Sequence, residues 1–340
     1  LTDFVVMTRA ASMFLTGPSV VHAALGEEVS TPALGGADVH ARNGVCQFVA
    51  QDERAAAALV RELLAYLPQH AAAAVPAQPS RPPAAGDPAR FLPHTTRQVY
   101  DVRDVARAIV DDGSLLEVSA RWARNMVTAF ARLDGRAVGL VANQPRHKGG
   151  VIDSEAARKA APFIRTCDAF GLPLVVLVDT PGFLPGRVQE RRGIIRDGAQ
   201  LLHAFAGAAV PRLTVVLRQA YGGAYITMNA RDLGADLVFA WPQARIGIMS
   251  ARAAVSVAAR REIAAAADPE AHRRALAERY ADEHQSAHAA ACGGFVDEVI
   301  APAATRARLC AALAALAGGH DADLRRSGHL LASVGRRVCD

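Results

Sequence analysis

The sequence predicts an α/β fold in which a sheet is covered by helices on at least one face. Short, continuously apolar runs are typical of buried strands, and helical stretches separate several of them. The predicted strands span residues 138–143, 173–179, 212–218, 235–241 and 245–249, and the two clearest helices span 154–170 and 193–208. Roughly the last ninety residues have mainly helical character.

A smaller unit precedes this pattern. Residues 69–97 are rich in proline and alanine and have no helical or strand period, which indicates a linker. Before the linker, an apolar stripe at i, i+3, i+4 spacing predicts a helix over residues 52–67. That stripe consists of Ala56, Leu59, Val60, Leu63 and Leu64. The predicted organisation is therefore 1–68, the linker 69–97, and 98–340.

Composition and charge exclude several function classes. The chain has 340 residues, of which 51% are apolar and 21% charged, as in globular proteins. No apolar stretch approaches the ~18 residues that span a bilayer, and the first residues do not resemble a signal peptide. The five cysteines are widely separated, which favours reduced thiols. We therefore expect a cytoplasmic protein without membrane contact, and the scattered arginines give no nucleic-acid-binding stripe.

The run "VVLVDTPGFLPG", residues 175–186, has the Asp-x-x-Gly pattern with which nucleotide hydrolases hold magnesium beside a phosphate. Those enzymes also need G-x-x-x-x-G-K-[ST], whose lysine contacts the phosphates. The chain has two lysines, Lys148 and Lys159, and neither follows a glycine nor precedes serine or threonine. The Asp-x-x-Gly match is therefore accidental.

Other common catalytic motifs give no prediction of a site. No serine lies in G-x-S-x-G, and Cys167 falls on the apolar side of a helix, which predicts a packed thiol. His284 and His288 have the i, i+4 spacing of metal ligands within an alanine-rich segment that we expect to be one helix. No third ligand is in register with them, so we expect no metal in this chain.

The stretch "RQAYGGAYITM", residues 218–228, is the most informative one. A predicted strand runs into a Gly-Gly pair, and a helix is expected to begin there. Backbone amides at a helix N-terminus, aided by the helix dipole, can stabilise a developing oxyanion. The alternative is a tight strand–helix junction that needs glycine only for steric reasons.

Several long segments resemble the carboxyltransferase (β) subunits of biotin-dependent acyl-CoA carboxylases of the propionyl-CoA and acetyl-CoA type. The segments similar to the C-terminal domain of that family are "YDVRDVARAIVDDGSLLEV", "GLVANQPRHKGGVIDSEAARKAAPFIRTCDAFGLPLV", "VDTPGFLPG", "QERRGIIRDGAQLLHAFAGAAVPRLTVV", "RQAYGGAYITM" and "GADLVFAWPQARIGIM". Those similar to the end of its N-terminal domain are "LTDFVVMTRAASMFLTGPSVV", "LGGADVH" and "NGVCQFVAQDE". The resemblance covers nearly the whole chain, in order.

The resemblance implies a crotonase-like (ClpP/crotonase) fold and a division into domains. Residues 1–68 would be the C-terminal remnant of an N-terminal carboxyltransferase domain, and 98–340 a complete C-terminal domain on the biotin side. Roughly the first third of a family member would be missing, together with the Gly-Gly pair that holds the thioester enolate. We expect a fragment, a truncated gene product or one half of a split subunit.

The resemblance also implies chemistry without a side-chain acid or base at its centre. Carboxybiotin loses CO2, its ureido nitrogen takes a proton from the acyl α-carbon, and the resulting enolate attacks CO2. The backbone donors that face the biotin ureido oxygen fall on Gly223 and Ala224. The residues implied to contact biotin or substrate are Gly222, Tyr225, Ile226, Pro181, Gly182, Phe183, Leu184, Pro185 and Gly186. Asp179 would be a structural carboxylate that ends a strand and caps the next turn.

Two features bear on specificity and activity within that family. Aspartate at the position of Ile226 is typical of propionyl-preferring members, so isoleucine leaves room for acetyl or longer chains. Family members tend to have glycine where Ser250 and Ala253 stand. Where two backbone segments approach closely, an added Cβ atom can strain or shift the backbone. The two substitutions therefore count against full carboxyltransferase activity.

The implied partners follow from what the sequence lacks. Neither lysine lies in an A-M-K-M-like biotinylation hairpin, and the sequence has no ATP-binding loop. Carboxybiotin would arrive on a separate carrier, normally part of an α subunit with biotin carboxylase, and the acyl group would arrive as a CoA thioester. The resemblance also implies a homo-oligomer, which is a hexamer in the family. Two alternatives remain: the carboxyltransferase of a biotin-dependent acyl-CoA decarboxylase, and an inactive truncated scaffold.

Overall fold

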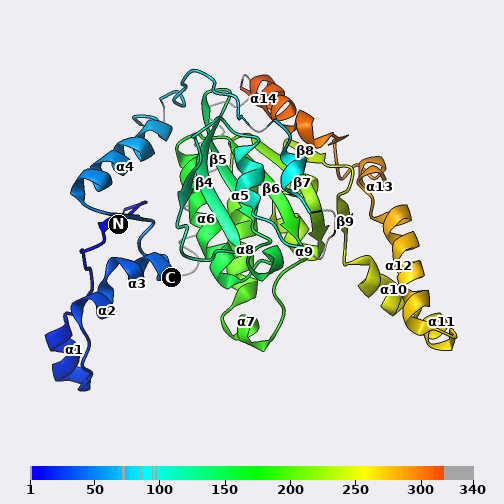
Figure 1. Cartoon of the computed structure of the whole chain (residues 1–340), viewed down its shortest axis with the longest axis horizontal. Helices are drawn as coiled ribbons and strands as arrows, with labels where there is room; N and C mark the ends of the chain where they lie inside the picture. Colours follow the sequence, from blue (N-terminus) through cyan, green and yellow to red (C-terminus); the bar gives the residue numbers. More distant parts are fainter. Residues whose placement is uncertain (1, 71–72, 85, 94, 96–97, 318–340) are drawn as a thin grey trace.

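The computed structural model describes residues 2–70, 73–84, 86–93, 95 and 98–317, and a mixed eight-stranded sheet forms its centre (Figure 1). The strands are β3 (Leu116–Val118), β4 (Met126–Leu133), β5 (Arg136–Asn143), β6 (Leu174–Thr180), β7 (Arg212–Tyr221), β8 (Leu237–Ala240), β9 (Arg245–Gly247) and β10 (Glu298–Val299). Their order is β10-β8-β7-β6-β5-β4-β3, and β9 pairs with the end of β7. The pairs β3–β4 and β4–β5 are antiparallel and the others are parallel.

The α/β prediction is confirmed, and each predicted strand has a counterpart in the sheet. Three strands of the sheet, β3, β4 and β10, were not recognised in the sequence, and the longest of them is β4. It forms a hairpin with β5 through Asp134 and Gly135, which have φ values of 52° and 76°. Asp-Gly is the pair that two-residue hairpin turns prefer, because both central residues need positive φ. The signal for β4 was therefore present.

Helices cover both faces of the sheet. The helices α6 (Ser154–Ala169) and α8 (Ile194–Ala206) pack together on one face, in agreement with the two helices predicted there. The helices α5 (Val102–Arg107) and α14 (Thr305–Leu316) lie on the other face. Side chains of β4 alternate between the two layers, so that Phe130 joins the first core and Val127 the second.

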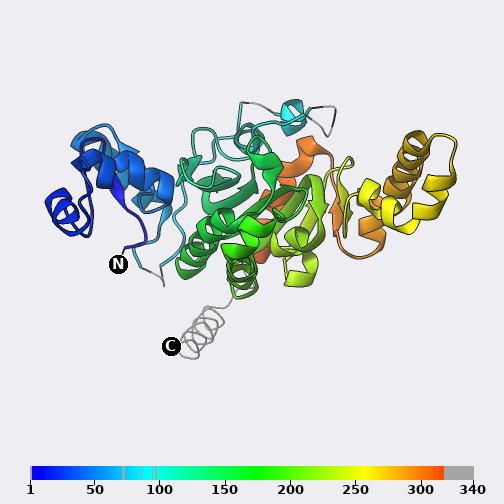
Figure 2. The same cartoon turned by 90° about the horizontal axis from the view of Figure 1, so that it is seen from below.

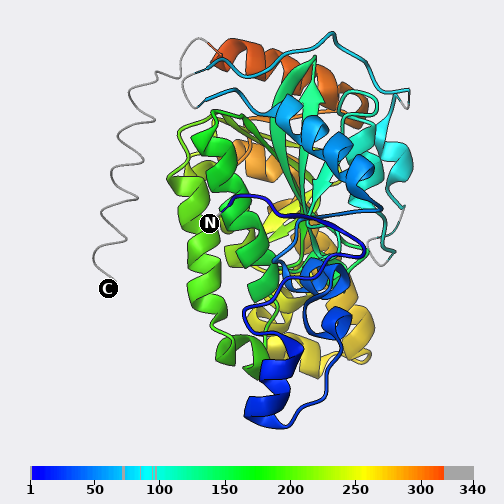
Figure 3. The same ribbon diagram turned by 90° about the vertical axis from the view of Figure 1, so that its left-hand side faces the viewer.

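The N-terminal segment, residues 2–67, lies beside this sheet (Figure 3). It consists of β1 (Val6–Thr8), α1 (Pro18–Leu25), α2 (Thr31–Gly35), α3 (Ala37–Asn43), β2 (Phe48–Ala50) and α4 (Glu53–Tyr66), and the two strands pair in parallel. The side chain of Asp52 accepts a hydrogen bond from Ala55 N (2.8 Å) and caps α4, so the helix starts where it was predicted. Only part of the predicted stripe is buried: Leu63 packs inside, whereas Leu64 is exposed.

The described part of the predicted linker is tied to the sheet region. The amide of Gln78 donates to the carbonyl of Gly135 (3.0 Å), and that of Asp112 donates to the carbonyl of Arg81 (2.8 Å). A short 3-10 helix occupies Pro88–Phe91. This stretch therefore follows the rim of the sheet as ordered chain, and the boundaries 1–68, 69–97 and 98–340 stay a prediction.

A helical arm projects at the end of the molecule opposite to the N-terminal segment (Figure 2). It consists of α10 (Ala251–Ala258), α11 (Arg260–Ala265) and α12 (Pro269–His284), which share a small core of Val255, Ile263 and Leu276. The chain then returns through α13 (Ala287–Cys292) to β10 and α14. The helical character predicted for the last part of the chain holds for the described residues up to 317.

Candidate active site at the ends of two parallel strands

The two predicted site segments lie next to each other. The strands β6 and β7 are parallel neighbours, so the loops that follow them leave the same edge of the sheet. Phe183, in the loop after β6, lies between α8 and α9 (Gly222–Thr227), the short helix that follows β7. A Cβ built on Gly198 of α8 would lie 3.1 Å from its ring, and one built on Gly223 would lie 3.8 Å from it.

The loop of residues 181–186 is held by backbone hydrogen bonds. The amide of Ile152 donates to the carbonyl of Gly182 (3.1 Å), and the amide of Leu184 donates to the carbonyl of Ile152 (2.8 Å). The exposed residues of the loop are Pro181, Pro185 and Gly186, while Gly182, Phe183 and Leu184 are half-buried. The loop thus presents a fixed, partly apolar surface toward the turn after β7.

The turn after β7 leads directly into α9 (Gly222–Thr227). Gly222 has a φ of 63°, and a Cβ there would lie 3.0 Å from the carbonyl oxygen of Ile248, so this position requires glycine. The first amides of a helix have no acceptor one turn earlier. In the described part of the chain, no acceptor outside the helix is found for the amides of Gly223 and Ala224.

The two amides differ in access. Gly223 is exposed, whereas Ala224 has no exposed surface. Gly223 is therefore the residue of the two that lies at the surface of the turn, and Ala224 lies behind it.

The next two side chains point to different surroundings. Tyr225 is 7% exposed, and its hydroxyl donates to the carbonyl of Phe295 (3.3 Å). Burial raises the pKa of Tyr225 to about 12, so the hydroxyl stays protonated at neutral pH. Ile226 is 42% exposed on the same short helix. Of the two residues, Ile226 is thus the one that can meet a ligand.

Asp179 lies at the end of β6, as predicted, and is 2% exposed. The prediction that it caps the following turn is wrong. The hydroxyl oxygen of Thr180 accepts a hydrogen bond from the amide of Gly182 (3.3 Å) and fulfils that role. The Asp179 carboxylate is instead directed toward β7, where it accepts hydrogen bonds from other donors.

The histidine pair does not share a helix, contrary to the expectation. His284 ends α12, whereas His288 belongs to α13. The side chain of Ser286 accepts a hydrogen bond from Ala289 N (3.2 Å) and starts the second helix between them. Among the described residues, no group of three or more His, Cys, Asp or Glu side chains is placed to hold a metal ion.

Two further expectations concern buried or substituted positions. Cys167 has no exposed surface, in agreement with a packed thiol. Ser250 precedes α10 with a φ of −57°, and Ala253 lies within that helix. Neither residue is among the described non-glycine residues with positive φ, so neither position requires glycine for its φ value.

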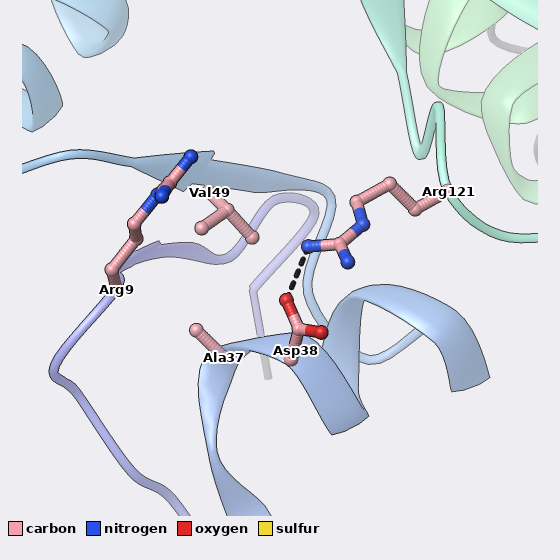
Figure 4. Close-up of a pocket in the computed structure, with 5 residues that line it drawn as sticks. All are labelled: Arg9, Ala37, Asp38, Val49 and Arg121. Atoms are coloured by element: carbon pink, nitrogen blue, oxygen red, sulfur yellow. Dashed lines mark hydrogen bonds and ion pairs between the residues drawn. The ribbon is translucent and has the colours of Figure 1, made fainter.

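A cavity of about 600 Å³ lies away from these loops, beside the N-terminal segment. Its lining residues are Arg9, Ala37, Asp38, Val49 and Arg121 (Figure 4). The guanidinium of Arg121 donates to the carboxylate of Asp38 (2.5 Å) and lowers the pKa of that carboxyl group. The cavity contains none of the predicted site residues, so it does not contribute to the site described above.

Comparison with known proteins places the chain in a family. The profile of the carboxyl transferase domain matches residues 1–328. The chain belongs to the carboxyl transferase domain family. It is 49% identical over 316 residues to the methylmalonyl-CoA carboxyltransferase 12S subunit of Propionibacterium freudenreichii subsp. shermanii, covering 92% of this chain and 60% of the relative.

Other carboxyl transferase relatives agree. The chain is 44% identical over 339 residues to the propionyl-CoA carboxylase beta chain of Saccharopolyspora erythraea, covering 95% of this chain and 62% of the relative. A crystal structure of transcarboxylase 12S, a hexamer with methylmalonyl-CoA bound, superposes with a TM-score of 0.88 at 47% identity over 93% of this chain and 62% of its own. The crotonase-like fold is thereby confirmed. This chain spans roughly 60% of the length of these relatives.

Among the described residues, no helix combines the length and apolarity that crossing a bilayer requires.

Proposed function

We propose that this carboxyl transferase domain moves a carboxyl group from biotin on a carrier protein to the α-carbon of a short-chain acyl-CoA, propionyl-CoA or acetyl-CoA. The observation that carries the proposal is the turn at Gly222–Ala224. Gly223 is exposed at this turn, and it lies beside the loop of residues 181–186 at the carboxyl edge of the sheet.

The features of the turn fit a biotin ureido group. Gly222 lets the backbone approach Ile248 closely, and this places the start of α9 at the surface. Bound carboxybiotin supplies the carboxyl group as CO2 and the ureido nitrogen as proton acceptor. The amide of Gly223 donates to the ureido oxygen as negative charge develops there, and the amide of Ala224 is the second donor. One such donor is typically worth ~3 kcal/mol of barrier.

The loop of residues 181–186 forms a wall of the biotin pocket. Phe183 supplies a half-buried ring against Gly223, and Leu184 adds apolar surface next to it. Such a wall holds the ring of biotin and excludes water from the reacting atoms. Ile226, exposed beside the turn, limits the size of the acyl group that fits.

The proposed partners follow from the same site. We assign the biotin half of the reaction to residues 98–340 and expect donors for the thioester enolate from an N-terminal carboxyltransferase domain. The carboxyl group comes from a biotin carboxylase and biotin carrier subunit in the cytoplasm. Transcarboxylase 12S is a hexamer, and we propose a homo-oligomer here as well.

Two alternatives are each favoured by one observation. The chemistry at the turn is reversible, so the same site also suits the carboxyltransferase of an acyl-CoA decarboxylase. The burial of Ala224, one of the two expected donor residues, favours an inactive scaffold subunit.

The test is a transfer assay with the purified chain and a biotin carrier that bears a radiolabelled carboxyl group. Acetyl-, propionyl- and butyryl-CoA are the acceptors in the forward direction. The reverse direction is tested with uncarboxylated carrier and with malonyl- or methylmalonyl-CoA that bears the label in its free carboxyl group. The proposal predicts label in methylmalonyl-CoA or malonyl-CoA, the carboxylated products of propionyl-CoA and acetyl-CoA. A folded chain that transfers no label in either direction, yet associates with a complete carboxyl transferase relative, contradicts the proposal and supports the scaffold.

A further inference from the structure

The pairing of β6 and β7 is interrupted just before both site loops. Val178 pairs with Val216, but the next pair is Thr180 with Ala220, so three residues of β7 lie opposite a single residue of β6. That residue is Asp179. Bulges of this kind leave backbone amides without their ladder partner and redirect the strand that follows.

The carboxylate of Asp179 replaces the missing ladder bonds. Its Oδ1 accepts a hydrogen bond from the amide of Gln219 in the bulge (3.2 Å). Its Oδ2 accepts from Nε of Arg218 (3.0 Å) and from the hydroxyl of Tyr100 (2.8 Å). This carboxylate thus connects the end of β6 to the end of β7. Asp179 precedes the loop 181–186 by two residues, and its partner Gln219 precedes Gly222 by three.

Arg218 extends this connection to a third segment. Its Nη1 donates to the carbonyl of Gln98 (2.8 Å), and its guanidinium lies 5.1 Å from the ring centroid of Tyr100. Tyr100 directly precedes the cap of α5, on the opposite face of the sheet from α8. The side chains of Tyr100, Asp179 and Arg218 therefore join both site loops to the chain that enters the sheet region.

The burial of the three side chains makes this arrangement rigid. The exposed fractions are 7% for Tyr100, 2% for Asp179 and 6% for Arg218. Burial raises the pKa of Asp179, and the positive charge of Arg218 opposes that rise. Burial also raises the pKa of Tyr100 well above its ordinary range, so its hydroxyl remains a donor. A buried pair that loses one partner leaves an unpaired charge, which is costly.

We propose that Tyr100, Asp179 and Arg218 are positioning residues that fix the biotin-side turn and the loop of residues 181–186 relative to each other. This inference rests on the proposed function. An error of about 1 Å in the placement of the amide at Gly223 can reduce transfer by on the order of 100-fold. The three side chains are buried, and in this proposal they act through the two loops.

The test compares Tyr100→Phe with the matched control Tyr66→Phe in the full chain. Tyr66 is also buried, and its hydroxyl donates to the carbonyl of Ser114 (2.6 Å), but it lies in the N-terminal segment. We expect Tyr100→Phe to lower kcat/KM for the biotin carrier by on the order of 10-fold with an unchanged KM for acyl-CoA. Tyr66→Phe leaves both parameters near those of the original chain.

Amide hydrogen exchange provides the second readout, and it requires no activity. Tyr100→Phe is expected to speed exchange at Gln219 and in residues 181–186, and Asp179→Asn to do so more strongly. Unchanged exchange in these segments overturns the proposal. The proposal is also overturned if the kcat of Tyr100→Phe falls only in proportion to the fraction of that variant that is folded, while both KM values stay unchanged. If the original chain transfers no carboxyl group, the proposed function fails, and exchange alone decides whether the three residues fix the loops.

Discussion

The sheet region and the N-terminal segment bury their apolar side chains to very different degrees. The central strands β4 to β7 are almost wholly buried, with helices on both faces. In the N-terminal segment, Leu15 is 107% exposed and Leu25 is 75% exposed, and its own cluster has three buried members, Met7, Ala37 and Cys46. The sheet region therefore has far more buried apolar surface to stabilise it.

The contact between the two regions explains how the N-terminal segment is held. Phe130 of β4 lies within ring-contact distance of Phe4 (5.8 Å) and Tyr66 (5.8 Å) on one side, and of Phe163 in α6 (5.1 Å) on the other. The candidate site lies entirely in the sheet region. We infer that the position of the biotin-side loops depends on the packing of the sheet region. The N-terminal segment has a small core of its own and is stabilised mainly by its contact with the sheet region.

The largest expected effect on stability comes from Phe130→Ala, which removes the ring that both regions share. We expect the free energy of unfolding to fall by about 3–5 kcal/mol, because the cavity lies inside a closely packed core. Leu15→Ala is the control, with an expected change within about 0.5 kcal/mol because that side chain is exposed. Urea denaturation measures both, and equal losses would refute the contrast between the regions.

A second test uses Lys159, a cation within the core of the sheet region. Its Nζ donates to the carbonyls of Trp122 (3.0 Å) and Met126 (2.7 Å), and burial lowers its pKa to about 8 from an ordinary 10.5. Between about pH 8, the pKa of Lys159 in the folded chain, and pH 10.5, its pKa in the unfolded chain, the unfolded chain binds more protons than the folded chain. Raising the pH through this range therefore increases the free energy of unfolding.

The matched comparison is with Lys159→Met, which cannot titrate. The stability of the original chain relative to this variant is expected to rise by on the order of 3 kcal/mol as the pH increases from about 7 to about 10.5. Denaturation of both proteins across that range measures the difference. A difference that does not vary with pH means that Lys159 is not desolvated in the folded protein.

A smaller and more local effect is expected from Met7→Ala. Met7 is 5% exposed in the small N-terminal cluster, and its truncation should cost about 2 kcal/mol, the low end for such a change. Hydrogen exchange should speed up in β1 and β2 while β5 and β6 keep their protection. Loss of protection in both sets of strands would show that the two regions unfold as one unit.

The smallest expected effect concerns acyl selectivity at Ile226. A charged side chain there disfavours longer acyl chains, so Ile226→Asp should raise the preference for propionyl-CoA over butyryl-CoA by about 10-fold. Val60→Asp, on α4 of the N-terminal segment, is the control and should leave selectivity unchanged. The ratio of kcat/KM values for the two substrates measures the shift, and an unchanged ratio removes Ile226 from the acyl pocket.

Much of the sheet region could be predicted from local pattern. Continuous apolar runs located five strands, and the Gly-Gly turn was expected where α9 begins, because these features depend on neighbours in sequence. The hairpin at Asp134–Gly135 was overlooked although its turn signal is local. The break between α12 and α13 at Ser286 could also have been expected from its capping side chain.

Other features depend on contacts that no local pattern reports. Nothing near Asp179 in the sequence shows that its partners are Tyr100 and Arg218, 79 and 39 residues away. The exposure of Leu64 and burial of Leu63 likewise follow from where α4 meets the sheet. The burial of Ala224 beside the exposed Gly223 likewise depends on packing around the whole turn, which the local sequence does not report.

The most direct measurement of the central claim compares carboxyl transfer by Gly223→Pro and Gly223→Ala. The alanine variant keeps the amide N–H, and its Cβ would meet the Phe183 ring at an ordinary 3.8 Å. The proline variant lacks the N–H but is tolerated in a first helical turn. With both variants folded by circular dichroism, we predict a kcat lower by about 100-fold or more for proline, and near the original value for alanine. Equal kcat values for the two variants would contradict the role of this amide.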